Sequence, residues 1–125
     1  MISPNVAAAF TLIACAGAIV LGGIHYSSGL AEVLPKRGRQ FPNDDYAWYF
    51  LLDTVVWDRT MPHAARRHYM MFLVNACIAV ACMLGVGLLH GSRFEVVMTG
   101  GLLSVCVGHT LIRWKRYQNG RFDHD

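Results

Sequence analysis

The chain has 125 residues, of which 54% are hydrophobic and 15% are charged, and its formal net charge at pH 7 is +3. Little sequence remains outside its long apolar runs, so a separate soluble domain is excluded and we expect one membrane unit. Nucleic-acid binding is not expected, because the basic residues flank the apolar runs, where anionic lipid headgroups account for them.

Three apolar runs contain no Lys, Arg, Asp or Glu, and they cover residues 6–24, 69–89 and 96–112. A hydrocarbon core about 30 Å thick needs roughly 20 apolar helical residues, so each run can cross a bilayer. The sequence therefore predicts an all-α integral membrane protein with three transmembrane helices.

We expect one membrane domain over residues 1–125. Its transmembrane helices are placed at about 5–25, 62–90 and 94–114. A loop over about 26–61 joins the first two helices, and a tail over about 115–125 follows the third. The first run lacks preceding basic residues and is therefore expected to be an uncleaved anchor.

The distribution of basic residues predicts the orientation. Six Lys and Arg residues lie between the first two runs and four follow the third, whereas the turn between the second and third runs holds only Arg93. Basic segments stay on the cytoplasmic side, so the N-terminus is expected outside and the C-terminus in the cytoplasm. The setting predicted is the bacterial inner membrane, in a multi-pass protein.

The loop contains two different segments. Residues 26–42 are rich in Gly, Pro and basic residues and are expected to form an irregular linker on the lipid headgroups. Residues 46–57 are almost wholly apolar or aromatic and are preceded by acidic residues suited to a helix start. We expect a short interfacial helix over about 44–58, with Trp48 and Trp57 contacting lipid headgroups or a partner.

Small residues recur along each apolar run at helical spacing, which allows close approach of another backbone. We expect these positions to contact other helices or partner subunits: Ala14, Ala18 and Gly22, then Ala81 and Gly85, then Gly100, Ser104 and Gly108. Asn75 is expected to hydrogen-bond to another helix or a partner, because an unpaired amide in hydrocarbon is costly.

The candidate chemistry lies in three histidines. His109 is about one turn inside the cytoplasmic end of its helix, with Arg113 one further turn along the same face. One hypothesis is that His109 only bonds to a neighbouring helix. The other is that His109, with His25 or His68, holds haem b or lines a quinone pocket. No spacing typical of a metal site is present, and the four Cys residues lie within the apolar runs.

The sequence contains no nucleophile elbow or P-loop, so we expect no enzymatic activity from the chain alone. The predicted function is a small accessory or scaffolding subunit of a multi-subunit inner-membrane complex, respiratory or photosynthetic, without a cofactor of its own. The alternative is the haem b-binding or quinone-binding anchor. A third hypothesis is a pore or transporter formed by homo-oligomerisation.

Overall fold

The computed structural model describes residues 2–33, 52–53, 56–57 and 61–120. Its three long helices are α1 (Pro4–Val33), α3 (His63–His90) and α4 (Arg93–Gln118). All three are long and apolar enough to cross a membrane. Within the described ranges there is no strand, so the predicted all-α class with three helices of spanning length is confirmed.

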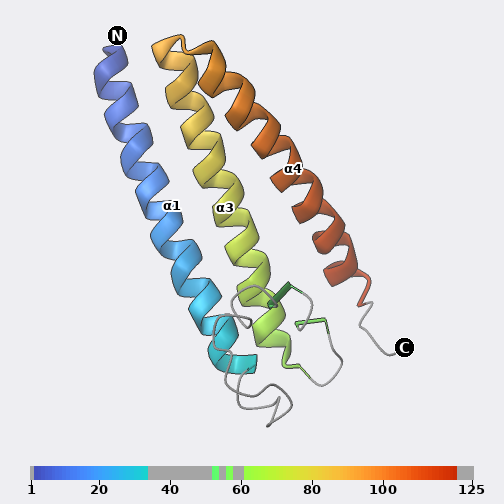
Figure 1. The fold of residues 1–125 in the computed structure, drawn as a ribbon. Coiled ribbons are helices and arrows are strands. Elements are labelled where there is room, and N and C mark those ends of the chain that lie inside the picture. The colour runs from blue at the N-terminus through green and yellow to red at the C-terminus, as the bar shows by residue number, and fades with distance from the viewer. Residues whose placement is uncertain (1, 34–51, 54–55, 58–60, 121–125) are drawn as a thin grey trace, which may run out of the picture.

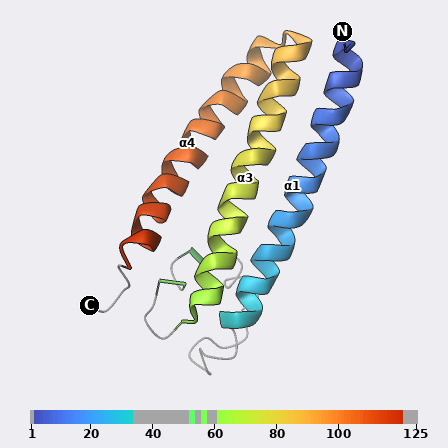
Figure 2. The ribbon, with the colours of Figure 1, turned by 180° about the vertical axis from the view of Figure 1, so that it is seen from behind.

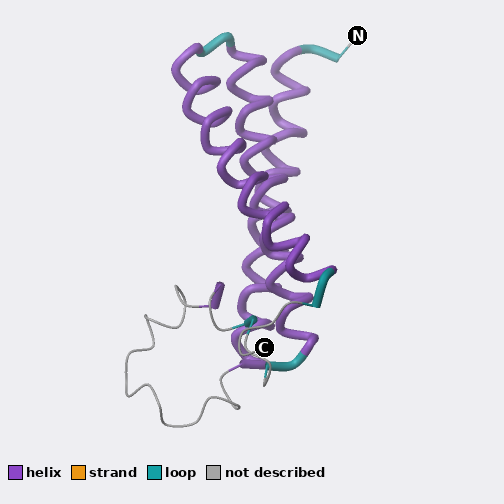
Figure 3. The backbone as a smooth tube through the Cα atoms, turned by 90° about the vertical axis from the view of Figure 1, so that its right-hand side faces the viewer, coloured by secondary structure: helices purple, strands orange, loops and turns teal. Residues whose placement is uncertain are grey.

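The helices lie side by side, and α3 is the middle one (Figures 1 and 2). It packs against α1 on one side and against α4 on the other. The start of α1 and the turn between α3 and α4 lie at one end of the molecule (Figure 3). The end of α1, the start of α3 and the end of α4 lie at the opposite end, which we call the basic end after Arg66, Arg67, Lys115 and Arg116.

Helix α1 is longer than predicted. The linker expected from residue 26 onward is helical as far as Val33. The reason is burial, because Gly29, Leu30 and Val33 are buried in the contact with α3 and with Leu52, Val56 and Trp57. This apolar contact outweighs the weak helix propensity of Gly and Ser in this stretch. Helix α4 also continues beyond its predicted end near residue 114, to Gln118.

Local signals set the turn between α3 and α4. Gly91 ends α3 in the left-handed conformation, with φ of 68°, and its N–H donates to the last turn of the helix. Ser92 then caps α4, because its hydroxyl accepts a hydrogen bond from the Glu95 N–H at 3.4 Å. Gly87 allows the close approach that follows, since a Cβ there would lie 3.2 Å from the Cβ of Glu95. The chain therefore reverses direction between the two helices within Gly91 and Ser92.

The contact between α1 and α3 is made through small side chains. Cys15 and Ala18 of α1 are buried against Ala79 of α3. Gly22 is buried as well, and a Cβ there would lie 3.4 Å from the Cβ of Asn75. Lipid provides no hydrophobic drive for helix association, so this close fit and its dispersion energy hold the pair together.

The largest packed cluster lies at the basic end. Trp57 and Val56 are fully buried there, together with Leu52 and with Tyr69 of α3. Most of the predicted interfacial helix over about 44–58, including Trp48, lies outside the described residues. Trp57 itself is packed inside the chain and is not available to headgroups or to a partner, which corrects that part of the prediction.

Adjacent glycines of α1 provide a matched test of this packing. Replacement of Gly22 by Leu is expected to destabilise the fold by about 1–3 kcal/mol, because the side chain would collide with Asn75 and Phe72. Gly23→Leu should have little effect, since nothing lies within 4 Å of a Cβ at that position. Thermal unfolding of both variants in detergent measures the difference, and equal melting temperatures would contradict the described α1–α3 contact.

Candidate functional site

A polar cluster joins three separate parts of the chain at the basic end. In the sequence, Asp53 falls between α1 and α3. Its Oδ2 accepts a hydrogen bond from Arg113 Nη2 of α4 at 2.7 Å. Its Oδ1 accepts a hydrogen bond from the Tyr69 hydroxyl of α3. His109 Nε2 of α4 lies 3.6 Å from the same oxygen. We call Asp53, Tyr69, His109 and Arg113 the Asp53 cluster.

The Asp53 cluster is partly withdrawn from solvent. The side chains of Asp53 and Arg113 are 29% and 21% exposed. At this degree of burial, removal of one charge leaves the other without its partner at a cost well above that of a surface ion pair. His109 and Arg113 reach the same carboxylate because they lie four residues apart on one face of α4. The shared face was predicted from the sequence, whereas the carboxylate between them was not.

Trp57 supports the cluster from inside the chain. Its ring lies edge-on to Tyr69, with centroids 6.4 Å apart. The guanidinium carbons of Arg113 and Arg116 lie 6.0 and 5.1 Å from its centroid, within cation–π range. The neighbouring Val56 carbonyl accepts a hydrogen bond from Arg66 Nε of α3 at 2.9 Å. Arginine side chains of α3 and α4 therefore contact Asp53, Val56 and Trp57.

The three candidate histidines do not converge on one point. His25 of α1 and His68 of α3 face each other, with their Nδ1 atoms 3.0 Å apart, which is a hydrogen-bond distance. His109 instead contacts Asp53 and Tyr69. Among the described residues, no group of three or more His, Cys, Asp or Glu side chains is arranged to hold a metal ion.

A small cavity of about 260 Å³ lies between α3 and α4 beside the Asp53 cluster. Its walls are mostly apolar, and its lining residues are Leu73, Ala76, Val105, Cys106, His109 and Thr110. The Thr110 hydroxyl is already engaged, because it donates to the Cys106 carbonyl and contacts the Cys77 sulfur. The His109 ring is therefore the polar group that this cavity offers to a ligand.

The predicted partner-binding residues fall into two groups. Ala18 and Gly22 are buried in the α1–α3 contact, and Gly85 also faces α1, because a Cβ there would lie 3.8 Å from Thr11. The second group points away from the rest of the described chain. Ala14, Ala81 and Ser104 are exposed, and nothing lies within 4 Å of a Cβ at Gly100 or Gly108.

Asn75 bonds within its own helix. Its amide nitrogen donates to the Met71 carbonyl at 2.8 Å, and the residue is buried against α1. A bond to another helix was predicted from the cost of an unpaired amide. The Met71 carbonyl, one turn earlier in the same helix, accepts a hydrogen bond from this amide, so the amide is partly satisfied without another helix. The sequence alone does not show that this local bond forms.

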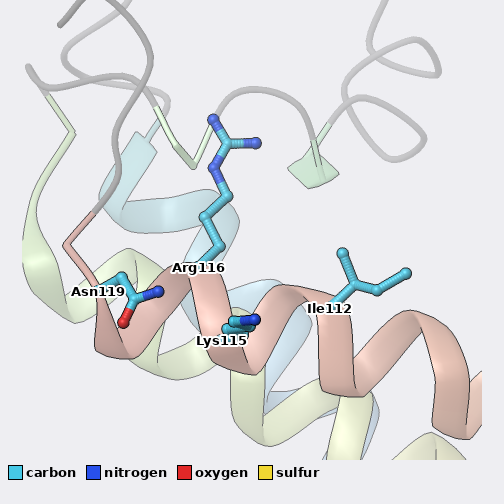
Figure 4. Close-up of a pocket in the computed structure, with 4 residues that line it drawn as sticks. All are labelled: Ile112, Lys115, Arg116 and Asn119. Atoms are coloured by element: carbon cyan, nitrogen blue, oxygen red, sulfur yellow. The ribbon is translucent and has the colours of Figure 1, made fainter.

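A second cavity, of about 420 Å³, lies at the C-terminal end of α4 and is shown in Figure 4. Ile112, Lys115, Arg116 and Asn119 line it, and we call it the basic cavity. These positions recur at intervals of three and four residues, so they share one face of the helix. Lys115 has no hydrogen-bond or ion-pair partner among the described residues.

Sequence reasoning missed Asp53 and Tyr69. The available signal was that Asp53 is the single charge within the apolar segment 46–57. A lone carboxylate in such a segment requires a polar partner when the segment is buried. Which helix supplies that partner depends on tertiary structure. Comparison of the chain with protein-family models, with curated proteins and with solved structures finds no match.

A double-mutant cycle tests the central ion pair. Asp53→Asn and Arg113→Gln are each expected to lower the free energy of unfolding, and the double variant should lose less than the two losses added together. The coupling expected for groups in contact is about 0.5–3 kcal/mol, measured by thermal or chemical unfolding in detergent. Arg67→Gln serves as the control, because Arg67 is exposed at the same end. Full additivity of Asp53→Asn with Arg113→Gln would contradict the described contact.

Proposed function

We propose that the chain is a small accessory or scaffolding subunit of a multi-subunit complex in the bacterial inner membrane, in a respiratory or photosynthetic setting. The observation that carries the proposal is the exposure of α4. No residue of this helix is buried, although it is apolar enough to span a membrane. Of the other long helices, it packs against α3, and its last turns also contact Asp53 and Trp57 through Arg113 and Arg116.

The outward face of α4 supports contact with another protein. Gly100 and Gly108 have open space at their Cβ positions, and Ser104 between them is exposed. Such a face allows a second backbone to approach closely, which is how helices associate in lipid. Large apolar side chains, including Val105 at 69% exposure, flank it and can pack around an incoming helix.

The Asp53 cluster fits this role, because it links Asp53, α3 and α4 in one geometry. A scaffold needs such rigidity, since a partner site held by ordered side chains costs less entropy on binding. The Asp53 carboxylate needs no substrate, because it accepts hydrogen bonds from Tyr69 and Arg113 within the chain.

The alternative is a quinone-binding anchor, and one observation favours it. His109 lines the cavity between α3 and α4, and the described residues provide no partner for its Nδ1 atom. The Asp53 carboxylate beside the ring would repel an anion, so a neutral ring with carbonyl or hydroxyl oxygens suits the cavity. Haem b fits less well, because His25 and His68 lie against each other while His109 contacts Asp53 and Tyr69, so neither predicted ligand pair, His109 with His25 or with His68, is brought together.

Purification from the native membrane in mild detergent tests the scaffold. Stoichiometric partner subunits are expected with the wild-type chain, and Gly108→Leu should reduce their recovery because the added side chain blocks close helix approach. Leu102→Phe is the control, since it enlarges an exposed side chain that is already large. A quinone that co-purifies without partner subunits and is lost in His109→Ala would instead favour the anchor.

Reporter fusions test the proposed orientation. Apart from Arg93, the Lys and Arg residues of α3 and α4 gather at one end, which is expected to face the cytoplasm. A reporter that is active only in the cytoplasm should therefore work after Asp125 and fail when inserted at Gly91. The reverse result would place the basic end outside and contradict the assignment.

A further inference from the structure

We infer that His25 and His68 form a binding site for a divalent transition-metal ion, for which Cu²⁺ fits best. His25 belongs to α1 and His68 to α3, and the two helices pack side by side (Figure 1). Two protein ligands come together here, rather than three or more of the described residues, so water completes the coordination of the ion. The inference rests on the packing of α1 against α3 and does not depend on the scaffolding role.

The spacing of the two ring nitrogens matches a chelated ion. The Nδ1 atoms of His25 and His68 lie 3.0 Å apart. Imidazole nitrogen binds such ions at about 2.0–2.1 Å, so two nitrogens at a right angle around one ion lie about 2.9 Å apart. Right-angle positions are those of tetragonal Cu²⁺ sites. Binding therefore requires the two rings to turn toward one point, while α1 and α3 keep their separation.

The hydrogen bond between the two rings does not block the ion. It places a proton on one Nδ1 atom and leaves a lone pair on the other. When that proton moves through water to Nε2 of the same ring, both Nδ1 atoms have lone pairs and both rings stay neutral. The ion then takes the place of the proton between the helices, and the pair neither gains nor loses a proton overall.

Close packing on both sides of His25 holds the two rings in place. Gly22 and Gly29 lie one turn before and one turn after it, on the face of α1 that packs on α3. A Cβ at Gly29 would lie 3.5 Å from the His68 Cβ, and one at Gly22 would lie 3.4 Å from the Asn75 Cβ. Two packed helices keep their ligands in register, so little side-chain entropy is lost when the ion binds.

The two nitrogen ligands favour one kind of ion. Imidazole binds Cu²⁺, Ni²⁺ and Zn²⁺, whereas Mg²⁺ and Ca²⁺ prefer oxygen ligands. Among the first-row divalent ions, Cu²⁺ has the highest affinity for nitrogen sites, and it accepts ligands at right angles. Tetrahedral Zn²⁺ would need the two nitrogens about 3.4 Å apart. The pair therefore favours Cu²⁺ over Zn²⁺ in both affinity and geometry.

The surroundings of the pair admit a cation. His25 directly follows the first apolar run and His68 directly precedes the second, so the pair lies at the edge of the hydrocarbon region. Both residues are half-buried. Arg67 beside His68 is exposed, so water weakens its repulsion of a cation, and Arg66 directs its Nε at the Val56 carbonyl. An ion in solution can therefore reach the two imidazoles in spite of the basic residues nearby.

The test titrates Cu²⁺ into the purified full-length chain in detergent, without a polyhistidine tag, and follows binding by isothermal titration calorimetry. His25→Gln and His68→Gln are each expected to weaken the tightest site on the order of 100-fold, because only one ligand remains. His90→Gln is the matched control, since His90 ends α3 at its far end and contacts the Val86 carbonyl of its own helix. An equal loss in His90→Gln, or wild-type affinity in either variant of the pair, would overturn the inference.

Two further measurements separate a metal site from a pair that is only hydrogen-bonded. The electron paramagnetic resonance spectrum of bound Cu²⁺ should show coupling to two imidazole nitrogens in the wild type and lose one of them in each variant of the pair. Cu²⁺ should raise the melting temperature of the wild type and of His90→Gln but not of the pair variants, since the ion joins α1 to α3 only in the folded chain. Melting without metal shows that each variant folds. Absence of the two-nitrogen signal, or an equal effect of Mg²⁺ on the melting temperature, would refute the site.

Discussion

The ion pair between Arg113 and Asp53 is the contact on which the arrangement at the basic end depends. Helices α1 and α4 lie on opposite sides of α3, and Asp53 and Trp57 supply further contacts to α3 and α4. The carboxylate stays partly buried only because a guanidinium, a phenol and an imidazole surround it. Trp57 then fills the space beneath these polar groups. Polar and apolar contacts therefore cooperate at the basic end.

The spanning helices could be predicted because their signal is local. A charge-free run of about 20 apolar residues satisfies its backbone only as a helix in hydrocarbon, so three runs predict three helices. Their ends were harder to place. Gly29, Leu30 and Val33 extend α1 because they meet α3 and the side chains of Leu52, Val56 and Trp57, and no window within residues 26–33 contains that information. Trp57 was assigned to an interface for the same reason, since its aromatic character suits both a membrane surface and a core.

The candidate sites also have features that the local sequence predicts and features that depend on tertiary structure. The shared face of His109 and Arg113 follows from helical spacing, and their common neighbour Asp53 follows from tertiary structure. The pairing of His25 with His68 required the register between α1 and α3, which small residues such as Gly22 determine. The small-residue positions were predicted as one set, but Ala18, Gly22 and Gly85 contact another helix of the chain, whereas Ala14, Ala81 and the positions of α4 face outward. The small residues of a helix indicate that it makes close contacts, but only the packed structure shows which helix is the partner.

The turn at Gly91 and Ser92 also constrains how the chain is made. Two helices joined so tightly are expected to insert into a bilayer as one hairpin, so that neither reverses its direction without the other. Arg67 and Lys115 lie at the open end of that hairpin, and their charges are therefore expected to bias the orientation of both helices together.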